Sequence, residues 1–322
     1  MEFDFIRSLV GRIPAHPGVL IGPGGDDAAL LARPSGDVIA TVDVLTDGVD
    51  FLLNEVEPHR IGRKALAVNL SDAAAMGARP IAALVAVCLP KSGGRTLGEQ
   101  LYDGILPLAA EFDCPIVGGD VHTWDGPLVL SITVLGQASE AGVLRRSAAQ
   151  AGDRILVTGE FGGSILGKQF DFTPRVREGL FLARDYGVRC AMDVSDGLAA
   201  DLNHLATESN LGAVLDLSSI PIAADAFRLV ERERERAAAG LSPLTPGGAA
   251  STPLEHALFD GEDFELIFSA SPEVAERLLA DQPFAARLTD VGEFVEDRGL
   301  WSRDEDGMIL PLSPKGWVHS LE

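Results

Sequence analysis

The first half of the chain alternates between short apolar runs and segments with a helical period. We expect a strand at 37–44, in which the mainly apolar stretch 38–42 is typical of a buried strand that ends at Asp43. Residues 58–77 begin with a proline and place apolar side chains three or four positions apart, which predicts a helix. The unbroken apolar run at 81–89 predicts a central strand. We also expect strands at 26–31, 114–118 and 127–136, and helices within 1–20 and at 96–112.

The second half opens after a small, polar stretch at 139–152, where the pattern predicts a change of domain. An apolar run at 154–158 predicts a strand, and it leads into the glycine-rich segment 159–163. Residues 231–253 combine alternating Glu and Arg with small and polar residues, which predicts a solvated helix end and a surface loop. We further expect helices at 174–186 and 198–209, and strands at 213–217, 263–269 and 287–295.

Length and patterning together predict two domains. At roughly 150 residues per domain, a chain of 322 residues is long enough for two. The change of pattern places the boundary so that the domains span 1–140 and 141–322. The fold class is therefore α/β, with mixed α and β elements in both domains.

Charge narrows the classes of partner. The chain has 26 Lys and Arg against 48 Asp and Glu, a formal net charge of −22. Such a balance disfavours nucleic acid and anionic membranes, which need clustered cations. It is compatible with nucleotides, because carboxylates can hold divalent cations that in turn hold phosphates.

The cysteines and the terminal segment point to the cytoplasm. The three cysteines form no CxxC pair, so neither a zinc site nor a disulfide framework is predicted. The acidic N-terminal segment is unlike a signal peptide, and no apolar run reaches about 18 residues. We therefore expect a cytoplasmic protein without a membrane partner.

Five short acidic motifs lie where an apolar strand is expected to end or a helix to begin. They occupy 25–27, 41–43, 69–72, 118–120 and 193–197. Any one of them alone is more often a cap or a turn. Strand ends in α/β folds converge on one edge, where several carboxylates would repel one another unless cations lay between them. Mg²⁺ fits this pattern, and no EF-hand loop for calcium is present.

Glycines beside two of these motifs favour phosphate binding. Residues 22–25 and 118–119 are glycine-rich and would let the backbone approach a ligand closely. The segment 162–168 only superficially resembles a Walker A loop, because its spacing does not match. The chain also lacks the protein-kinase motifs. A phosphoryl-transfer enzyme with this sequence would therefore belong to neither common class.

In order and spacing, these motifs resemble thiamine-monophosphate kinase, a family of the aminoimidazole-ribonucleotide-synthetase superfamily. The resemblance runs from about residue 20 to the end of the chain. Its most specific stretches are Asn-Leu-Ser-Asp-Ala-Ala-Ala-Met-Gly-Ala at 69–78 and Gly-Glu-Asp-Phe-Glu-Leu at 261–266. Further stretches lie at 64–68, 117–120, 146–147, 152–153, 157–159 and 193–198.

The resemblance implies a fold and an activity. The N-terminal α/β domain would bind ATP and Mg²⁺ and pair with a second copy to build a shared β-barrel. The C-terminal domain would be α+β. The activity would be direct in-line transfer of the γ-phosphoryl group of ATP to thiamine monophosphate, and the protein would be a homodimer.

The resemblance also implies roles for individual residues. The metal ligands would be Asp27, Thr41, Asp43, Asp72, Asp120, Asp193 and Asp196. ATP would contact Gly119, Asp120, Arg146 and Ser195, and catalysis would rest on Asp120, Asp196 and Arg146. The thiamine part would contact Glu262 and Trp317. A cation with aromatic rings suits an indole face and a carboxylate. The plainer alternatives are a packing role for Trp317, a turn carboxylate for Glu262 and a surface pair for Arg146 with Arg145.

The chain departs from the family pattern on the acceptor side. Asp50 stands where the family has a substrate-contacting His, so a donor is replaced by an acceptor. Val42 stands where the family has a hydroxyl, and the segment between Gly163 and Pro174 is shorter than usual. These changes touch the acceptor site more than the ATP and metal sites.

Three other functions fit the same residues. The first is an enzyme of the same superfamily with a different small acceptor, which Asp50 favours. The second is a non-catalytic nucleotide-binding relative, which would bind ATP and Mg²⁺ without turnover. The third is an acidic oligomer whose carboxylates only keep it in solution.

Overall fold

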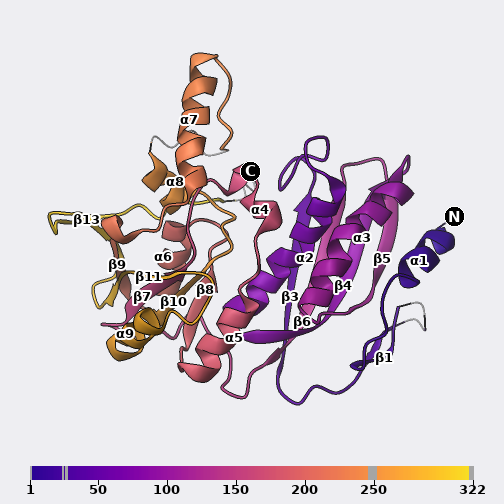
Figure 1. Cartoon of the computed structure of the whole chain (residues 1–322), viewed down its shortest axis with the longest axis horizontal. Helices are drawn as coiled ribbons and strands as arrows, with labels where there is room; N and C mark the ends of the chain where they lie inside the picture. The colour runs from indigo at the N-terminus through magenta and orange to yellow at the C-terminus, as the bar shows by residue number, and fades with distance from the viewer. Residues whose placement is uncertain (1, 24, 26–27, 246–251, 319–322) are drawn as a thin grey trace. The chain divides into compact units, whose positions relative to one another are not determined.

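The computed structural model describes residues 2–23, 25, 28–245 and 252–318 (Figure 1). The chain divides into two compact units. The first comprises Met1–Ala73 and Ala78–Glu140, and the second comprises Ala74–Gly77 and Ala141–Glu322. Among the described residues, every helix is too short or too polar to cross a bilayer.

In the described part of the first unit, four strands form one sheet with two long helices. The order in the sheet is β3-β6-β4-β5, antiparallel except for the parallel pair β4 and β5. A parallel pair needs a crossover connection, and here the helix α3 supplies it. The elements are α1 (Glu2–Val10), β1 (Val19–Ile21), β2 (Leu30–Leu31), β3 (Val38–Thr46), α2 (Pro58–Ala75), β4 (Ala78–Pro90), α3 (Gly94–Glu111), β5 (Ile116–Trp124) and β6 (Val129–Ala138).

Helices α2 and α3 pack with their backbones in close approach. A Cβ atom at Gly62 would lie 2.0 Å from the carbonyl oxygen of Leu101, and one at Gly104 would lie 1.7 Å from that of His59. Only glycine fits at such crossings. The buried residues of α2, including Ile61 and Leu66, complete this apolar layer.

Strand β3 corrects the prediction for 37–44. The strand does not end at Asp43 but continues to Thr46, and it lies at the edge of the sheet. Its side chains alternate: Leu45 is buried, whereas Val42 and Val44 are 58% and 57% exposed. An edge strand with one covered face shows this alternation. The apolar residues at 38–42 therefore form a strand that is covered on one face only, and not a strand that is buried on both faces. The central strand predicted at 81–89 is confirmed as β4, which lies between β6 and β5.

In the described part of the second unit, seven strands form a sheet in the order β13-β12-β9-β11-β7-β10-β8. Neighbours are antiparallel except β12 and β9. The strands are β7 (Arg154–Thr158), β8 (Cys190–Asp193), β9 (Gly212–Asp216), β10 (Leu266–Ala270), β11 (Leu288–Val295), β12 (Gly299–Arg303) and β13 (Ile309–Pro311). The helices are η1 (Ser164–Leu166), α4 (Lys168–Asp171), α5 (Val176–Asp185), α6 (Leu198–Glu208), η2 (Leu217–Ser219), α7 (Ala224–Ala238), α8 (Pro253–Phe259) and α9 (Pro272–Asp281).

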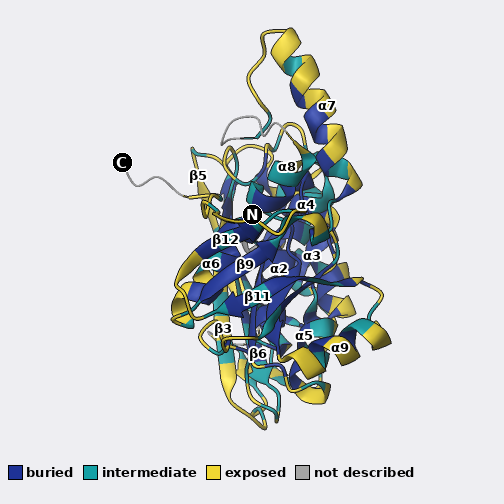
Figure 2. Ribbon diagram, turned by 90° about the vertical axis from the view of Figure 1, so that its left-hand side faces the viewer, coloured by how far each residue is buried: buried dark blue, intermediate teal, exposed yellow. Residues whose placement is uncertain are grey.

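The core of this unit lies between the sheet and α6. Ile155, Leu202, Ile267 and Phe294 are fully buried in it. Strand β10 is buried at every residue and β7 at every residue but Arg154, and β9, labelled in Figure 2, is mostly dark blue. The predictions of a strand at 154–158 and a helix from 198 are confirmed.

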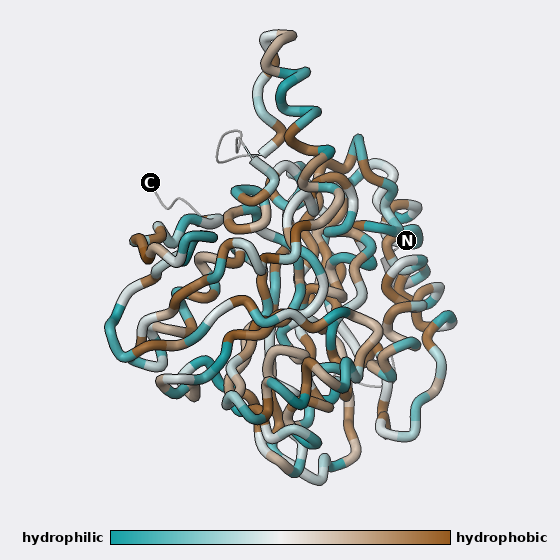
Figure 3. The backbone as a smooth tube through the Cα atoms, turned by 60° about the vertical axis from the view of Figure 1, so that its left-hand side comes forward, coloured by the Kyte–Doolittle hydropathy of each residue, from teal (hydrophilic) through white to brown (hydrophobic). Residues whose placement is uncertain are grey.

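The loop predicted within 231–253 is only partly correct. Helix α7 extends to Ala238 and buries one stripe of its residues. Hydrophilic and hydrophobic colours alternate along this helix (Figure 3). Residues 246–251 lie outside the described part of the chain. Pro253–Phe259 is the helix α8, begun by a capping box in which Thr252 and Glu255 satisfy each other's backbone N–H groups. The sequence carried a signal for the start of this helix: Thr252 is followed directly by a proline and, three residues later, by Glu255.

Candidate functional site

An acidic cluster in the first unit joins strand β3 to helix α2. The hydroxyl of Thr41 donates a hydrogen bond to the carboxylate of Asp72. Asp43 lies two residues further along β3, and its Oδ2 is buried without a partner among the described residues. Burial, and then the charges of Asp72 and Asp50, raise the pKa of Asp43 to about 7. A cation would relieve this excess of negative charge, so these residues fit an ion such as Mg²⁺.

The register of the strands places Asp120 outside this cluster. Residues paired across neighbouring strands share a face of the sheet, and the pairing runs from Asp43 through Ile132 and Val85 to Gly119. Asp120 follows Gly119 and pairs with Ala86, which places it on the other face. Gly119 has φ of 152°, and a Cβ there would lie 1.8 Å from the carbonyl oxygen of Val85.

The expectation that these carboxylates end strands or begin helices is wrong for Asp43, Asp72 and Asp120. Asp43 and Asp120 lie within strands, and Asp72 lies near the end of α2. Within the described ranges, no three His, Cys, Asp or Glu side chains converge as a metal-binding group. The predicted ligand Asp27 lies outside the described residues.

Asp50 closes its own turn. Its Oδ2 accepts a hydrogen bond of 2.7 Å from the backbone N–H of Thr46. Its carbonyl oxygen accepts one of 2.8 Å from the ammonium of Lys64, a side chain with no exposed surface. One role of the carboxylate is thus to hold the turn after β3.

In the second unit, the segment after β8 carries three of the predicted residues. Asp193 ends β8 and is 3% exposed, whereas Ser195 and Asp196 are partly exposed. The backbone N–H of Asp196 donates to the Asp201 carboxyl group at 3.0 Å. Burial above all raises the pKa of Asp201 to about 8, with further contributions from Asp193 and Asp196. Sequence reasoning missed Asp201, although an acidic residue in the first turn of a helix was visible.

Two distant segments converge on this loop. The backbone N–H of Glu262 donates to the carbonyl oxygen of Ser195 at 2.7 Å, and that of Trp317 donates to the carbonyl oxygen of Asp196 at 2.9 Å. A Cβ at Gly261 would lie 2.6 Å from the oxygen of Ser195. The structure therefore brings together four predicted residues of the second unit, Ser195, Asp196, Glu262 and Trp317.

Arg146 is held at a different place. Its carbonyl oxygen accepts hydrogen bonds from the hydroxyl of Ser209 at 3.0 Å and the thiol of Cys190 at 3.6 Å. Cys190 begins β8, and Asp193 ends it, so the strand separates the backbone of Arg146 from the acidic loop. Its side chain is exposed.

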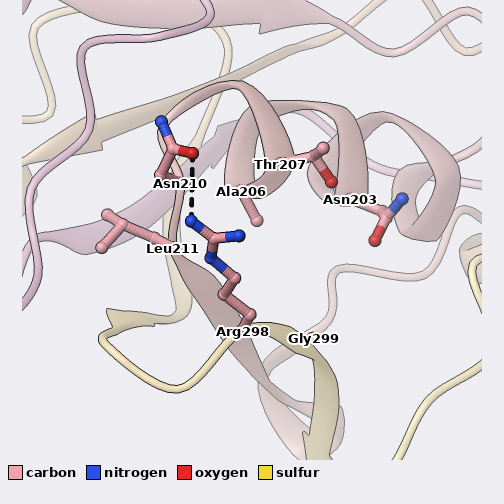
Figure 4. A pocket seen from close by; sticks show the side chains of 7 residues that line it. All are labelled: Asn203, Ala206, Thr207, Asn210, Leu211, Arg298 and Gly299. Atoms are coloured by element: carbon pink, nitrogen blue, oxygen red, sulfur yellow. Dashed lines mark hydrogen bonds between the residues drawn. The ribbon is translucent and has the colours of Figure 1, made fainter.

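A hollow of about 120 Å³ lies within the second unit (Figure 4). It sits between the C-terminal end of α6 and the start of β12, where Arg298 donates to the Asn210 side chain at 3.2 Å. No residue predicted to form the site lines it.

Comparisons with known proteins match both units. The family model of the AIR synthase related protein N-terminal domain matches residues 25–138, and that of the C-terminal domain matches 148–300. Thiamine-monophosphate kinase of Rhodopirellula baltica is 39% identical over 327 residues, covering 99% of this chain and 97% of that protein.

Two solved structures are similar over nearly the whole chain. Thiamine-monophosphate kinase of Stenotrophomonas maltophilia K279a has a TM-score of 0.76 at 34% identity, covering 94% of this chain and 95% of that one. A structure described as AaThiL complexed with AMPPCP and TMP has a TM-score of 0.72 at 26% identity, covering 99% and 96%.

Proposed function

The chain belongs to the AIR synthase related proteins and, among them, to the thiamine-monophosphate kinases, and we propose that it phosphorylates thiamine monophosphate with ATP. The products are thiamine diphosphate and ADP. The observation that carries this proposal is the 39% identity to a thiamine-monophosphate kinase over 99% of the chain. The similar structure complexed with AMPPCP, an analogue of ATP, and TMP supports ATP and thiamine monophosphate as the two ligands.

Each unit supplies part of the machinery. Phosphoryl transfer asks for positioning and neutralisation of charge more than for covalent chemistry. The metal ligands in the first unit are Asp27, Thr41, Asp43 and Asp72, with Asp120 as a further ligand on the other face of the sheet and so outside that cluster. Those in the second unit are Asp193 and Asp196. Mg²⁺, when bound, neutralises phosphate charge and stabilises the group in transfer. The buried, unpartnered oxygen of Asp43 supports this assignment.

In this proposal, ATP and thiamine monophosphate contact different residues. Gly119, Asp120, Arg146 and Ser195 contact ATP, and the planar guanidinium of Arg146 is suited to a phosphate. Asp120, Asp196 and Arg146 act on the reacting groups. The contacts of Glu262 and Trp317 with the loop at Ser195 and Asp196 support placing thiamine beside that loop. Asp50 acts on the acceptor side through the turn that it closes.

The outer face of β3 is the dimer interface in this proposal. Val38, Val42 and Val44 on this face are 51%, 58% and 57% exposed. A second copy of the chain that pairs on this face would cover them and give the shared barrel. We also propose that the enzyme acts in the cytoplasm, where ATP is available.

The test is formation of thiamine diphosphate, followed by mass, from purified protein, ATP, MgCl₂ and thiamine monophosphate. Magnesium-dependent product is expected, and Asp120→Asn should lower turnover at least about tenfold while the fold persists. Binding of ATP without product would instead favour a different acceptor, for which Asp50 is the motivating residue, or a non-catalytic relative. Other phosphorylated acceptors would then be assayed in competition.

A further inference from the structure

The turn that carries Glu262 has a strained backbone. Glu262 has φ of 66° and Phe264 has φ of 51°, so two residues with side chains lie in the left-handed region. Such conformations are costly for residues other than glycine and persist where the surroundings impose them. The carbonyl oxygens of Ser195 and Val194 accept hydrogen bonds from the N–H groups of Glu262 and Phe264 at 2.7 and 2.8 Å.

Two buried carboxylates anchor the same turn. Asp263 is fully buried, and its Oδ1 accepts from the hydroxyl of Ser164 at 2.7 Å. Glu265 is 3% exposed and forms a two-pronged ion pair with Arg175, at 2.7 and 2.8 Å. Lys168 bridges the two carboxylates, 3.4 Å from Asp263 and 3.3 Å from Glu265. A buried carboxylate without its cation is strongly unfavourable, so these pairs hold the turn in place.

The segment that resembled a Walker A loop fits against this turn. Gly159, three residues before this segment, also lies against the turn, since a Cβ there would lie 2.3 Å from the carboxylate of Glu265. The N–H of Gly162 donates to Asp263 at 2.9 Å, and Lys168 ends the segment. Gly162 and Lys168 thus bind carboxylates of the chain itself. This role accounts for a motif that the proposed function does not use.

We propose that Arg175 and Lys168 are positioning residues for the acceptor: through Glu265 and Asp263 they set the strained turn that presents Glu262 to thiamine monophosphate. This inference rests on the proposed function and on the role of Glu262 in it. Loss of either cation lets the turn relax, so the acceptor is bound less tightly. ATP binding changes less, because only Ser195 among the proposed ATP contacts is bonded to this turn.

The test compares steady-state constants of Arg175→Met, Arg175→Lys and Lys168→Met with a matched control. Arg154→Met is the control, because Arg154 on β7 makes a similar two-pronged pair with Asp290 on β11, at 2.8 and 2.9 Å, in the same unit. We expect KM for thiamine monophosphate to rise about tenfold in Arg175→Met and KM for ATP to change less than about twofold. Arg175→Lys should recover part of the loss, and Arg154→Met should leave both constants unchanged.

A double-mutant cycle with Glu262→Gln separates positioning from general damage. If Arg175 acts through Glu262, the two substitutions together should raise KM no more than Glu262→Gln alone. Fully additive effects, or equal changes in the KM values for ATP and acceptor, would overturn the proposal. So would an unchanged KM in Glu262→Gln, which refutes the role of Glu262 while the kinase activity stands. If Arg175→Met does not fold, Lys168→Met decides by the same criteria.

The unsubstituted enzyme is assayed alongside. If it makes no thiamine diphosphate, the proposed function fails and this inference falls with it. If it makes the product and the variants behave like Arg154→Met, only the positioning role is refuted.

Discussion

The backbone N–H of Trp317 donates a hydrogen bond of 2.9 Å to the carbonyl oxygen of Asp196. The bond ties a segment near the end of the chain to the loop after β8. A Cβ at Gly316 would lie 2.5 Å from the same oxygen, so the approach requires glycine before the tryptophan. Trp317 itself is 39% exposed, which leaves part of its indole available to a ligand.

We expect Trp317→Ala to weaken acceptor binding. A cation over an indole contributes about 0.5–2 kcal/mol, so KM for thiamine monophosphate should rise roughly 2- to 30-fold. Trp317→Phe should retain part of this binding, and the KM for ATP should stay near its original value. Lys315→Met, which removes the ammonium 5.6 Å from the ring of Phe259, is the matched control. An unchanged KM in Trp317→Ala would assign the indole to packing alone.

The acidic cluster predicts a pH-dependent gain in stability for Asp43→Asn. The pKa of Asp43 is raised from 3.8 to about 7 in the folded protein. The unfolded chain therefore loses this proton first, and ionisation costs stability as pH rises from about 4 to 7, by at most about 1.4 kcal/mol per pH unit. In metal-free buffer, Asp43→Asn should unfold at a higher temperature than the unsubstituted protein at pH 8, and the difference should shrink toward pH 4.

Mg²⁺ gives the complementary measurement. A ligand of the native state raises the unfolding temperature. MgCl₂ should therefore stabilise the unsubstituted protein at pH 8 and have a smaller effect on Asp43→Asn. Equal stabilisation of both proteins would remove Asp43 from the metal site.

The buried pair of Lys168 and Asp263 predicts a second pH effect. Burial raises the pKa of Asp263 to about 6, although the charge of Lys168 opposes this rise. At pH 8 the carboxylate is ionised and needs Lys168, whereas at pH 5 it is largely protonated in the folded state. Lys168→Met should therefore cost more stability at pH 8 than at pH 5, measured by urea unfolding at both values. In an Asp263→Asn background the difference between the two pH values should become small, and its persistence would point to another group.

The sequence predicted elements better than the site's geometry. The run at 154–158 predicted β7 with its bounds, because a short apolar stretch between polar segments has few other solutions. The alternation on β3 escaped prediction because apolar residues occupy both faces of this edge strand: Val42 and Val44 lie on the exposed face, and Leu45 lies on the covered one. The meeting of Ser195, Glu262 and Trp317 depends on long-range backbone hydrogen bonds, which leave no local pattern. A motif resemblance, not periodicity, pointed to those three residues.

The exposed face of β3 leads to a prediction about assembly. Thr41 donates to Asp72 on α2, so Val42, the next residue along the strand, faces away from that helix. If a second copy covers this face, a lysine at Val42 places a charge in an apolar interface, at a cost of several kcal/mol. Val42→Lys should therefore convert a dimer into a monomer, as measured by light scattering on a size-exclusion column. Met308→Lys is the control, because Met308 is equally exposed, at 58%, but lies beside β13 in the second unit. A dimer that survives Val42→Lys would place the interface on another surface, since a buried lysine without a partner is not tolerated at an apolar contact.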